Sequence, residues 1–225
     1  MAYRKNIFKN IKQINNFINK TYCKKTENDL SDTNLVKHYR NTPSSKNKIS
    51  ILKKQLKNLR FKVKDINRIV NNELILNEFC TPPGTKGAIR GNHFNNIVKN
   101  KILEIADKIP NKENYDVQFE KKVEFSPEIP DWFIKQKDNN KILIGMNQVD
   151  LWSGGQQTNR GSKYILNEDL HKNPNYKVIS VVSKYIQLES YNNKAYNILK
   201  KGFEENRLCY LCNLENIIKK YFDIK

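Results

Sequence analysis

Alternation of apolar and polar side chains predicts a β-sheet in the central and carboxyl-terminal parts of the chain. Within residues 116–125, Val117, Phe119, Val123 and Phe125 alternate with polar residues, as on a strand with one exposed face. Two short apolar runs at 131–136 and 141–150 are joined by the polar turn KQKDNN, which predicts a hairpin of buried strands. The run KVISVVS at 177–183 is rich in β-branched residues and predicts a further strand. LCYL, near the carboxyl end, predicts a last short strand.

Apolar residues at steps of three and four predict helices elsewhere in the chain. A helix is expected after Asn92, as its N-cap, and before Pro110, with a stripe formed by Phe94, Ile97, Val98, Ile102 and Ile105. Residues 51–70 carry a second, heptad-like stripe. Packing on the rest of the protein and a homodimer seam are both open for it, and the basic flanking positions favour packing. Its members are Leu52, Leu56, Leu59, Val63, Ile66 and Val70.

Breaks in these patterns predict two parts. Residues 1–80 form a basic helical amino-terminal extension, of which the first 50 residues are expected to be a loosely attached arm. The segment CTPPGTKGAIRGN interrupts regular structure with Pro-Pro and three glycines, which places a boundary near residue 80. Residues 81–225 then follow the order helix, strand, strand, strand, helix, strand. This order predicts an α/β domain with helices on both faces of a mixed sheet.

The net charge of the chain indicates the class of molecule that the protein binds. The chain has 225 residues, with 41 Lys and Arg against 23 Asp and Glu, for a formal charge of +18. Such an excess indicates a polyanionic partner, and double-stranded DNA is the first candidate. The alternative is that the many Lys, Asn and Ile residues reflect an AT-rich genome. At 38% hydrophobic residues the chain has enough apolar side chains for a core.

The location of the protein is predicted from what the sequence lacks. No apolar run approaches the ~18–20 residues of a transmembrane helix, and no secretory signal is visible near Met1, so no membrane partner is expected. The chain has four cysteines, too few for a disulfide scaffold of this length. An intracellular protein with reduced thiols is expected, cytoplasmic if the source is prokaryotic. Cys209 and Cys212 have the spacing of half a zinc site but no second pair, so we expect two small buried residues.

Part of the sequence resembles the PD-(D/E)XK nuclease superfamily, to which many type II restriction endonucleases belong. The resemblance covers about residues 86–190. Pro130-Asp131 matches the acidic residue that begins the second strand in that family, and ILIGMNQVD corresponds to its third strand. The preceding helix, RGNHFNNIVKNKIL, resembles the helix before the sheet. The resemblance implies a restriction-endonuclease-like core, α-β-β-β-α-β, with residues 81–225 as the nuclease domain.

The resemblance also implies a catalytic site that binds Mg²⁺. Gln148-Val149-Asp150 stands where the family has Asp/Glu-x-Lys, a departure that leaves the usual lysine without a counterpart in the third strand. Carboxylate and amide oxygens suit a hard cation, and residues two apart on a strand share one face, so Asp131, Gln148 and Asp150 are the expected metal ligands. Lys163, in the following helix, is expected to supply the missing ammonium at the phosphate. These four residues are the predicted catalytic set.

The polar stretch GGQQTNRGSKY that follows is a candidate DNA contact. Arg and Lys side chains suit phosphates, and Gln and Asn can read base edges. The predicted DNA-binding residues are Gln156, Gln157, Asn159 and Arg160. The alternative is an ordinary solvated helix face.

Together with these patterns, the resemblance implies a Mg²⁺-dependent DNA endonuclease, of the type II restriction kind. Two alternatives remain open. One is a repair or recombination nuclease of the same fold that recognises DNA structure. The other is a nucleic-acid-binding protein without catalytic activity, which the absent lysine favours.

Overall fold

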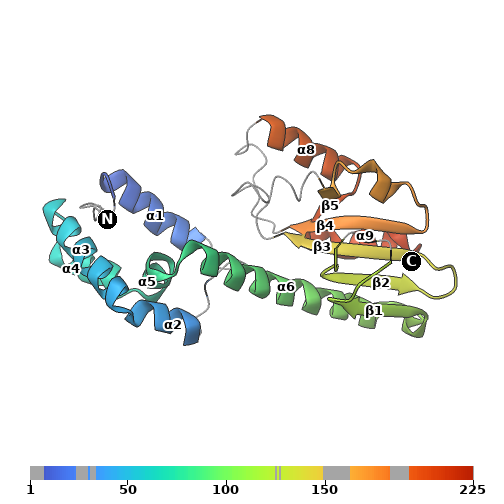
Figure 1. The fold of residues 1–225 in the computed structure, drawn as a ribbon, viewed down its shortest axis with the longest axis horizontal. Coiled ribbons are helices and arrows are strands. Elements are labelled where there is room, and N and C mark those ends of the chain that lie inside the picture. The colour runs from blue at the N-terminus through green and yellow to red at the C-terminus, as the bar shows by residue number, and fades with distance from the viewer. Residues whose placement is uncertain are drawn as a thin grey trace. The chain divides into compact units, whose positions relative to one another are not determined.

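The computed structural model describes residues 8–23, 30, 34–124, 126, 128–148, 163–182 and 193–224. The chain divides into two compact units, Met1–His93 and Phe94–Lys225. The division falls inside a single helix, α6 (Pro83–Lys108), shown in green in Figure 1. None of the described helices is both long and apolar enough to cross a membrane.

The amino-terminal unit is built from helices. They are α1 (Ile11–Cys23), α2 (Asn34–Asn41), α3 (Pro43–Asn58), α4 (Val63–Val70), α5 (Glu73–Cys80) and the beginning of α6. Thr42 caps α3 by accepting a hydrogen bond from Ser45 N at 3.2 Å, and Asn72 caps α5 by accepting one from Ile75 N at 3.1 Å. These side chains satisfy backbone donors that a helix start leaves unpaired.

The core of this unit differs from two expectations. The described residues among the first 50 are not a loose arm, because Ile14 and Val36 are buried and α1 packs into the same cluster as α3 and α4. The expected helix over 51–70 is two helices. The chain turns at Arg60, which has a φ of 62°, and Val63 is consequently 69% exposed rather than buried. Leu52, Leu56, Ile66 and Val70 are buried as expected, together with Ile69 and Ile75.

The segment CTPPGTKGAIRGN is not a break, because most of it belongs to α6. Pro83 begins the helix, where the missing N–H of proline costs nothing. Asn92 therefore lies inside the helix and does not cap it. Lys86 and Arg90, from the first turns of α6, both bind Glu78 of α5, with Lys86 Nζ 3.1 Å from Glu78 Oε1. The start of α6 is tied to the amino-terminal unit by these ion pairs.

The carboxyl-terminal unit contains a five-stranded mixed sheet in the order β1-β2-β3-β4-β5. Strands β1, β2 and β3 pair antiparallel, whereas β3, β4 and β5 pair parallel. The first expected strand is shorter than its alternating pattern, because Glu120 takes a φ of 51° and ends it. The strands are β1 (Tyr115–Phe119), β2 (Trp132–Gln136), β3 (Ile142–Gln148), β4 (Tyr176–Val182) and β5 (Leu208–Tyr210).

Helices cover both faces of this sheet. On one face, α6 and α9 (Leu214–Tyr221) bury Phe94, Val98, Ile102, Leu214 and Ile218 against the sheet. On the other face lie Tyr164 and α8 (Asn193–Glu204), above side chains of β3 and β4. Short 3₁₀ turns occupy Lys112–Asn114, Glu168–His171 and Leu211–Asn213. The unit is thus an α/β domain with a mixed sheet between helices, as the sequence predicts.

The two closely spaced cysteines do not behave alike. Cys209 lies buried in β5, where burial raises the pKa of its thiol to about 12. Cys212 is exposed, so the expectation that both are buried is wrong for it.

Candidate active site

Asp131 lies at the point where the antiparallel strands β1, β2 and β3 meet. Its backbone N–H donates to Gly145 O at 3.2 Å, and its carbonyl accepts from Glu120 N at 3.2 Å. The strand pairing therefore fixes Asp131 from both sides, with the end of β1 on one side and the second half of β3 on the other. A side chain held on a sheet in this way is positioned more rigidly than one on a loop.

The residue after Asp131 explains a glycine in the middle of β3. The indole of Trp132 is 1% exposed and lies directly over Gly145, so a Cβ there would come within 1.8 Å of Trp132 Cε2. Only glycine lets the indole approach the strand this closely. Trp132 Nε1 then donates to Asn147 Oδ1 at 3.1 Å, which satisfies a buried donor and orients the Asn147 amide.

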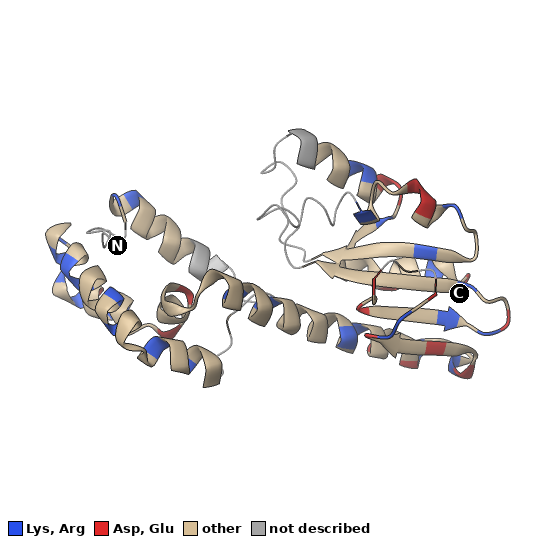
Figure 2. Cartoon of the chain, viewed as in Figure 1, with Lys and Arg blue, Asp and Glu red and all other residues tan. Residues whose placement is uncertain are grey.

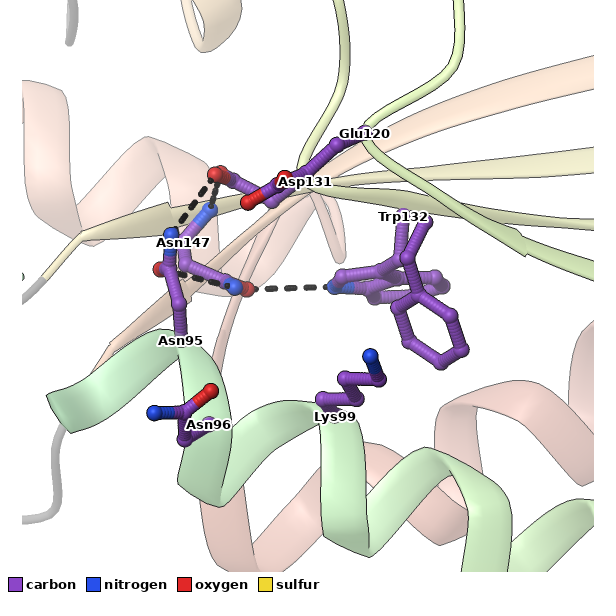
Figure 3. Close-up of a pocket in the computed structure, with 8 residues that line it drawn as sticks. Asn95, Asn96, Lys99, Glu120, Asp131, Trp132 and Asn147 are labelled. Atoms are coloured by element: carbon purple, nitrogen blue, oxygen red, sulfur yellow. Dashed lines mark hydrogen bonds between the residues drawn. The ribbon is translucent and has the colours of Figure 1, made fainter. Parts of the chain in front are cut away.

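A network of amides holds the Asp131 carboxylate. Asn147 N donates to Asp131 Oδ2 at 2.6 Å, and Asn95 Nδ2, from α6, donates to Asp131 Oδ1 at 3.2 Å. Asn147 Nδ2 donates in turn to Asn95 Oδ1 at 3.1 Å. The network connects β2, β3 and α6, as the dashed lines in Figure 3 show. Each carboxylate oxygen therefore accepts a hydrogen bond, which fixes the orientation of the side chain.

These residues border a pocket of about 270 Å³ within the carboxyl-terminal unit. Two further charged side chains line it. Glu120 adds a carboxylate at the end of β1, and Lys99 adds an ammonium from α6, where its Nζ lies 5.0 Å from the centroid of the Phe119 ring. Figure 3 shows Asn95 and Lys99 projecting from the helix toward the strand ends. The pocket thus combines acidic oxygens, one cation and amide groups.

The strand alternation places Asn147, rather than Gln148, in this pocket. Successive side chains of a strand point to opposite faces, so Gln148 follows Ile144 and Met146 to the other face of the sheet. Gln148 is 6% exposed and does not line the pocket. The residue of β3 that lies beside Asp131 is therefore Asn147, and Gln148 is not brought next to Asp131.

Lys163, the expected substitute ammonium, is bound to a carboxylate. Its Nζ lies 2.5 Å from Glu128 Oε1, and the buried Tyr164 donates its hydroxyl to Glu128 Oε2. Glu128 precedes Asp131 by three residues, so the ion pair ties Lys163 to the segment that leads into β2. The charge of Lys163 is therefore balanced by the Glu128 carboxylate.

The remaining predicted site residues lie outside the described part of the chain. They are Asp150, Gln156, Gln157, Asn159 and Arg160. Among the described residues, no three His, Cys, Asp or Glu side chains cluster in a way that would hold a metal ion.

The positive charge of the chain belongs mainly to the amino-terminal unit. Residues 1–93 contain 20 Lys and Arg against 6 Asp and Glu, a formal charge of +14, whereas residues 94–225 contain 21 against 17, or +4. Within 43–70 the only acid is Asp65, and Figure 2 shows Lys and Arg along α3 and α4. The basic side chains of this segment are all exposed, namely Lys46, Lys48, Lys53, Lys54, Lys57, Arg60, Lys62, Lys64 and Arg68.

Comparison of the sequence with protein-family models and with curated proteins found no match in either.

Four pocket residues did not stand out in the sequence. Asn95 and Lys99 are one helical turn apart, beside the apolar stripe of α6, and this spacing could have marked a polar face directed at the sheet. Asn147 could have been found by counting the strand alternation forward from Gly145. Glu120 resembled an ordinary exposed residue of an alternating strand, and no pattern in the sequence signals its positive φ.

Proposed function

We propose that the protein is a metal-dependent DNA endonuclease whose chemistry takes place in the pocket around Asp131. The observation that carries the proposal is the position of Asp131, whose carboxylate is held by Asn147 N at the junction of β2 and β3 and borders a pocket shared with Glu120 and Lys99. Support comes also from the order of elements after α6, in which three antiparallel strands precede a parallel one.

The donor set fits a magnesium ion. Mg²⁺ in phosphoryl-transfer sites is commonly bound through one or two carboxylates together with the phosphate of the substrate. Asp131 and Glu120 would hold it, with Asp150 as a further ligand expected from sequence. When bound, such an ion lowers the pKa of a coordinated water and neutralises charge on the phosphate.

The chain's own residues supply positioning and charge. Lys99 places an ammonium on the pocket, where it would attract a phosphate and offset the negative charge that develops during hydrolysis. The Asn95 and Asn147 amides fix the Asp131 carboxylate, so its oxygens need little rearrangement when substrate arrives. Lys163, which is paired with Glu128, would help to position the segment before β2 and would not contact the phosphate itself.

The amino-terminal unit would supply DNA affinity. Its formal charge of +14 and its exposed lysines on α3 and α4 suit contacts with phosphates, which are independent of base sequence. The same charge favours a second candidate, a DNA-binding protein without catalytic activity. DNA binding by the amino-terminal unit does not require a working catalytic pocket in the other unit.

The test is incubation of the purified protein with supercoiled plasmid DNA and Mg²⁺. Discrete fragments are expected for a restriction endonuclease, and cleavage confined to branched DNA is expected for a structure-specific repair nuclease. Binding without cleavage, in Mg²⁺ and in Mn²⁺, would support the non-catalytic candidate. Asp131→Asn and a chelator serve as controls, because contaminating nucleases would survive the substitution.

A further inference from the structure

A second pocket lies at the opposite end of the sheet from Asp131. Strands β3 and β4 run parallel, so their first residues lie at the same edge, whereas Asn147 is near the other end. The second pocket, of about 260 Å³, opens at this edge and is bordered by the last turn of α9. Three lysines line it, namely Lys141, Lys177 and Lys220.

One of these lysines is already occupied. Lys141 Nζ lies 2.8 Å from Asp223 Oδ2 and also donates to Tyr221 O at 3.4 Å. The other two, Lys177 and Lys220, have no carboxylate partner among the described residues. The pocket therefore presents two ammonium groups without a carboxylate partner among the described residues, whereas Lys141 is paired with the exposed Asp223.

Lys177 is the unusual member of the pair. It lies at the start of β4 on the same face as Ile179 and Val181, which puts the stem of a half-buried lysine on the side covered by α9. Burial, and then the like charge of Lys220, lower the pKa of its ammonium. A half-buried cation with a like charge beside it destabilises the unit unless an anion offsets the repulsion.

A tyrosine fixes the geometry of the pocket without serving as a ligand. The Tyr221 hydroxyl lies 3.1 Å from both Ile142 O and Asn175 O, the backbone that leads into β3 and β4. Burial raises the pKa of this phenol to about 12, so it stays a neutral donor to these carbonyls. The contact ties the end of α9 to the sheet edge and places Lys220 beside Lys177.

We propose that this pocket binds a phosphate group through Lys177 and Lys220. Phosphate matches two point-charge donors that converge on a small concave site, and the Asn206 amide, which also lines the pocket, provides a neutral donor. The phosphate could belong to a DNA backbone or to a small phosphorylated molecule. Phosphate binding here does not depend on nuclease activity, because the pocket lies at a different end of the sheet.

The first experiment follows the lysine side chains by ¹H–¹³C NMR of the Cε groups. Inorganic phosphate, at constant ionic strength, should shift the Lys177 signal saturably and raise the pKa of its ammonium. Lys220→Gln removes an exposed charge and should weaken phosphate binding at least tenfold. Lys200→Gln, on α8, is the matched control and should change nothing.

A non-saturating shift of equal size at Lys177 and Lys200 would overturn the proposal, as would unchanged binding in Lys220→Gln. Lys177→Met is the complementary variant. If it does not fold, Lys220→Gln still decides, because that side chain is exposed.

The second experiment distinguishes the source of the phosphate. A short DNA duplex is added in place of inorganic phosphate. If the site contacts DNA, the duplex shifts the Lys177 signal, and Lys220→Gln reduces the slope of log affinity against log salt by about one. If the site takes a small phosphorylated molecule, inorganic phosphate shifts the signal and the duplex does not. A signal that responds to neither overturns the inference and leaves the proposed nuclease site untouched.

Discussion

Asn147 donates its backbone N–H to the Asp131 carboxylate at 2.6 Å, so the end of β3 holds the first residue of the β2 segment by its side chain. The two strands are therefore connected by a hydrogen bond to a carboxylate as well as by the backbone hydrogen bonds of the sheet. It predicts that Asp131 has both a structural and a catalytic part, which substitutions can separate.

Asp131→Asn should abolish DNA cleavage while leaving DNA affinity equal or higher, because one charge that repels phosphate is removed. The amide has one acceptor oxygen where the carboxylate had two, so one N–H of the network loses its partner. We expect a loss of about 1–3 kcal/mol in the free energy of unfolding. Plasmid cleavage, DNA binding and urea unfolding measure the three effects. Asp107→Asn, an exposed carboxylate on α6, is the control, and cleavage by Asp131→Asn at the wild-type rate would contradict the site.

Lys99 and Lys163 are competing candidates for the catalytic ammonium. Lys99 lines the pocket, whereas Lys163 is paired with Glu128 at 2.5 Å. Lys99→Met should lower the cleavage rate by about 10² or more with little change in melting. Lys163→Met should act mainly on stability, and Glu128→Gln should reproduce its effect. The reverse ranking of the two cleavage rates would restore the assignment expected from sequence.

The exposed lysines of α3 should govern the salt dependence of DNA binding. Replacing Lys53, Lys54 and Lys57 by Gln should leave melting unchanged and reduce the slope of log affinity against log salt by about one for each phosphate that the variant no longer neutralises. Fluorescence anisotropy from low to moderate salt measures this slope. The matched control replaces Lys108, Lys172 and Lys200, which are exposed but paired with acids in the other unit. Equal slopes in the two triple variants would indicate that the charge reflects base composition.

Glu168 should contribute to the loss of stability in acid. Its carboxylate accepts hydrogen bonds from Arg207 Nη2 at 2.6 Å and Lys201 Nζ at 2.7 Å, and these hold its pKa at about 2, below the ordinary 4.5. The unfolded chain therefore takes up this proton first. The stabilisation is complete above about pH 4.5 and disappears as the pH falls toward 2. Glu168→Gln should flatten urea-unfolding stability across this interval, whereas Glu204→Gln on α8 should leave the curve parallel to wild type.

The glycines of α6 predict a stabilising change. No atom lies within 4 Å of a Cβ built at Gly87 or Gly91, and both positions are helical. Alanine restricts the unfolded chain more than glycine, so Gly87→Ala should raise stability by about 0.5–1 kcal/mol. Thermal unfolding of the whole chain measures it. Destabilisation by Gly87→Ala would mean that the helix bends or unwinds there in solution.

The sequence predicted most of the sheet but, of the pocket's polar network, only Asp131. The strand runs were readable because burial on both faces of β3 and β4 selects apolar, β-branched residues over several positions. The end of β1 could not be predicted, because the strand ends at the positive φ of a single residue, Glu120. The polar side chain of Glu120 still fits the alternating pattern. Asp131 was found through the family resemblance. Its partner Asn147 was not predicted, and the neighbouring Gln148 was predicted in its place, because a one-residue difference in register exchanges the two faces of a strand.

The boundary between the units shows another limit of reading a sequence. Pro-Pro and glycines indicate a break in most chains, but here Pro83 begins α6 and the ion pairs of Glu78 with Lys86 and Arg90 secure its first turns. Such pairs join residues from two helices, and no local pattern reports them. The structure divides the chain between His93 and Phe94, in a stretch that the sequence marked only as the start of a helix.

The fit of Trp132 over Gly145 imposes an order on the evolution of this protein. Any side chain at position 145 collides with the indole, so that site stays closed while the tryptophan is present. A smaller residue at 132 opens it, after which position 145 is free to drift and the return to tryptophan becomes blocked. In descendants of this chain, position 132 would therefore change before position 145. Once position 145 carries a side chain, a return to tryptophan at position 132 is blocked by the same collision.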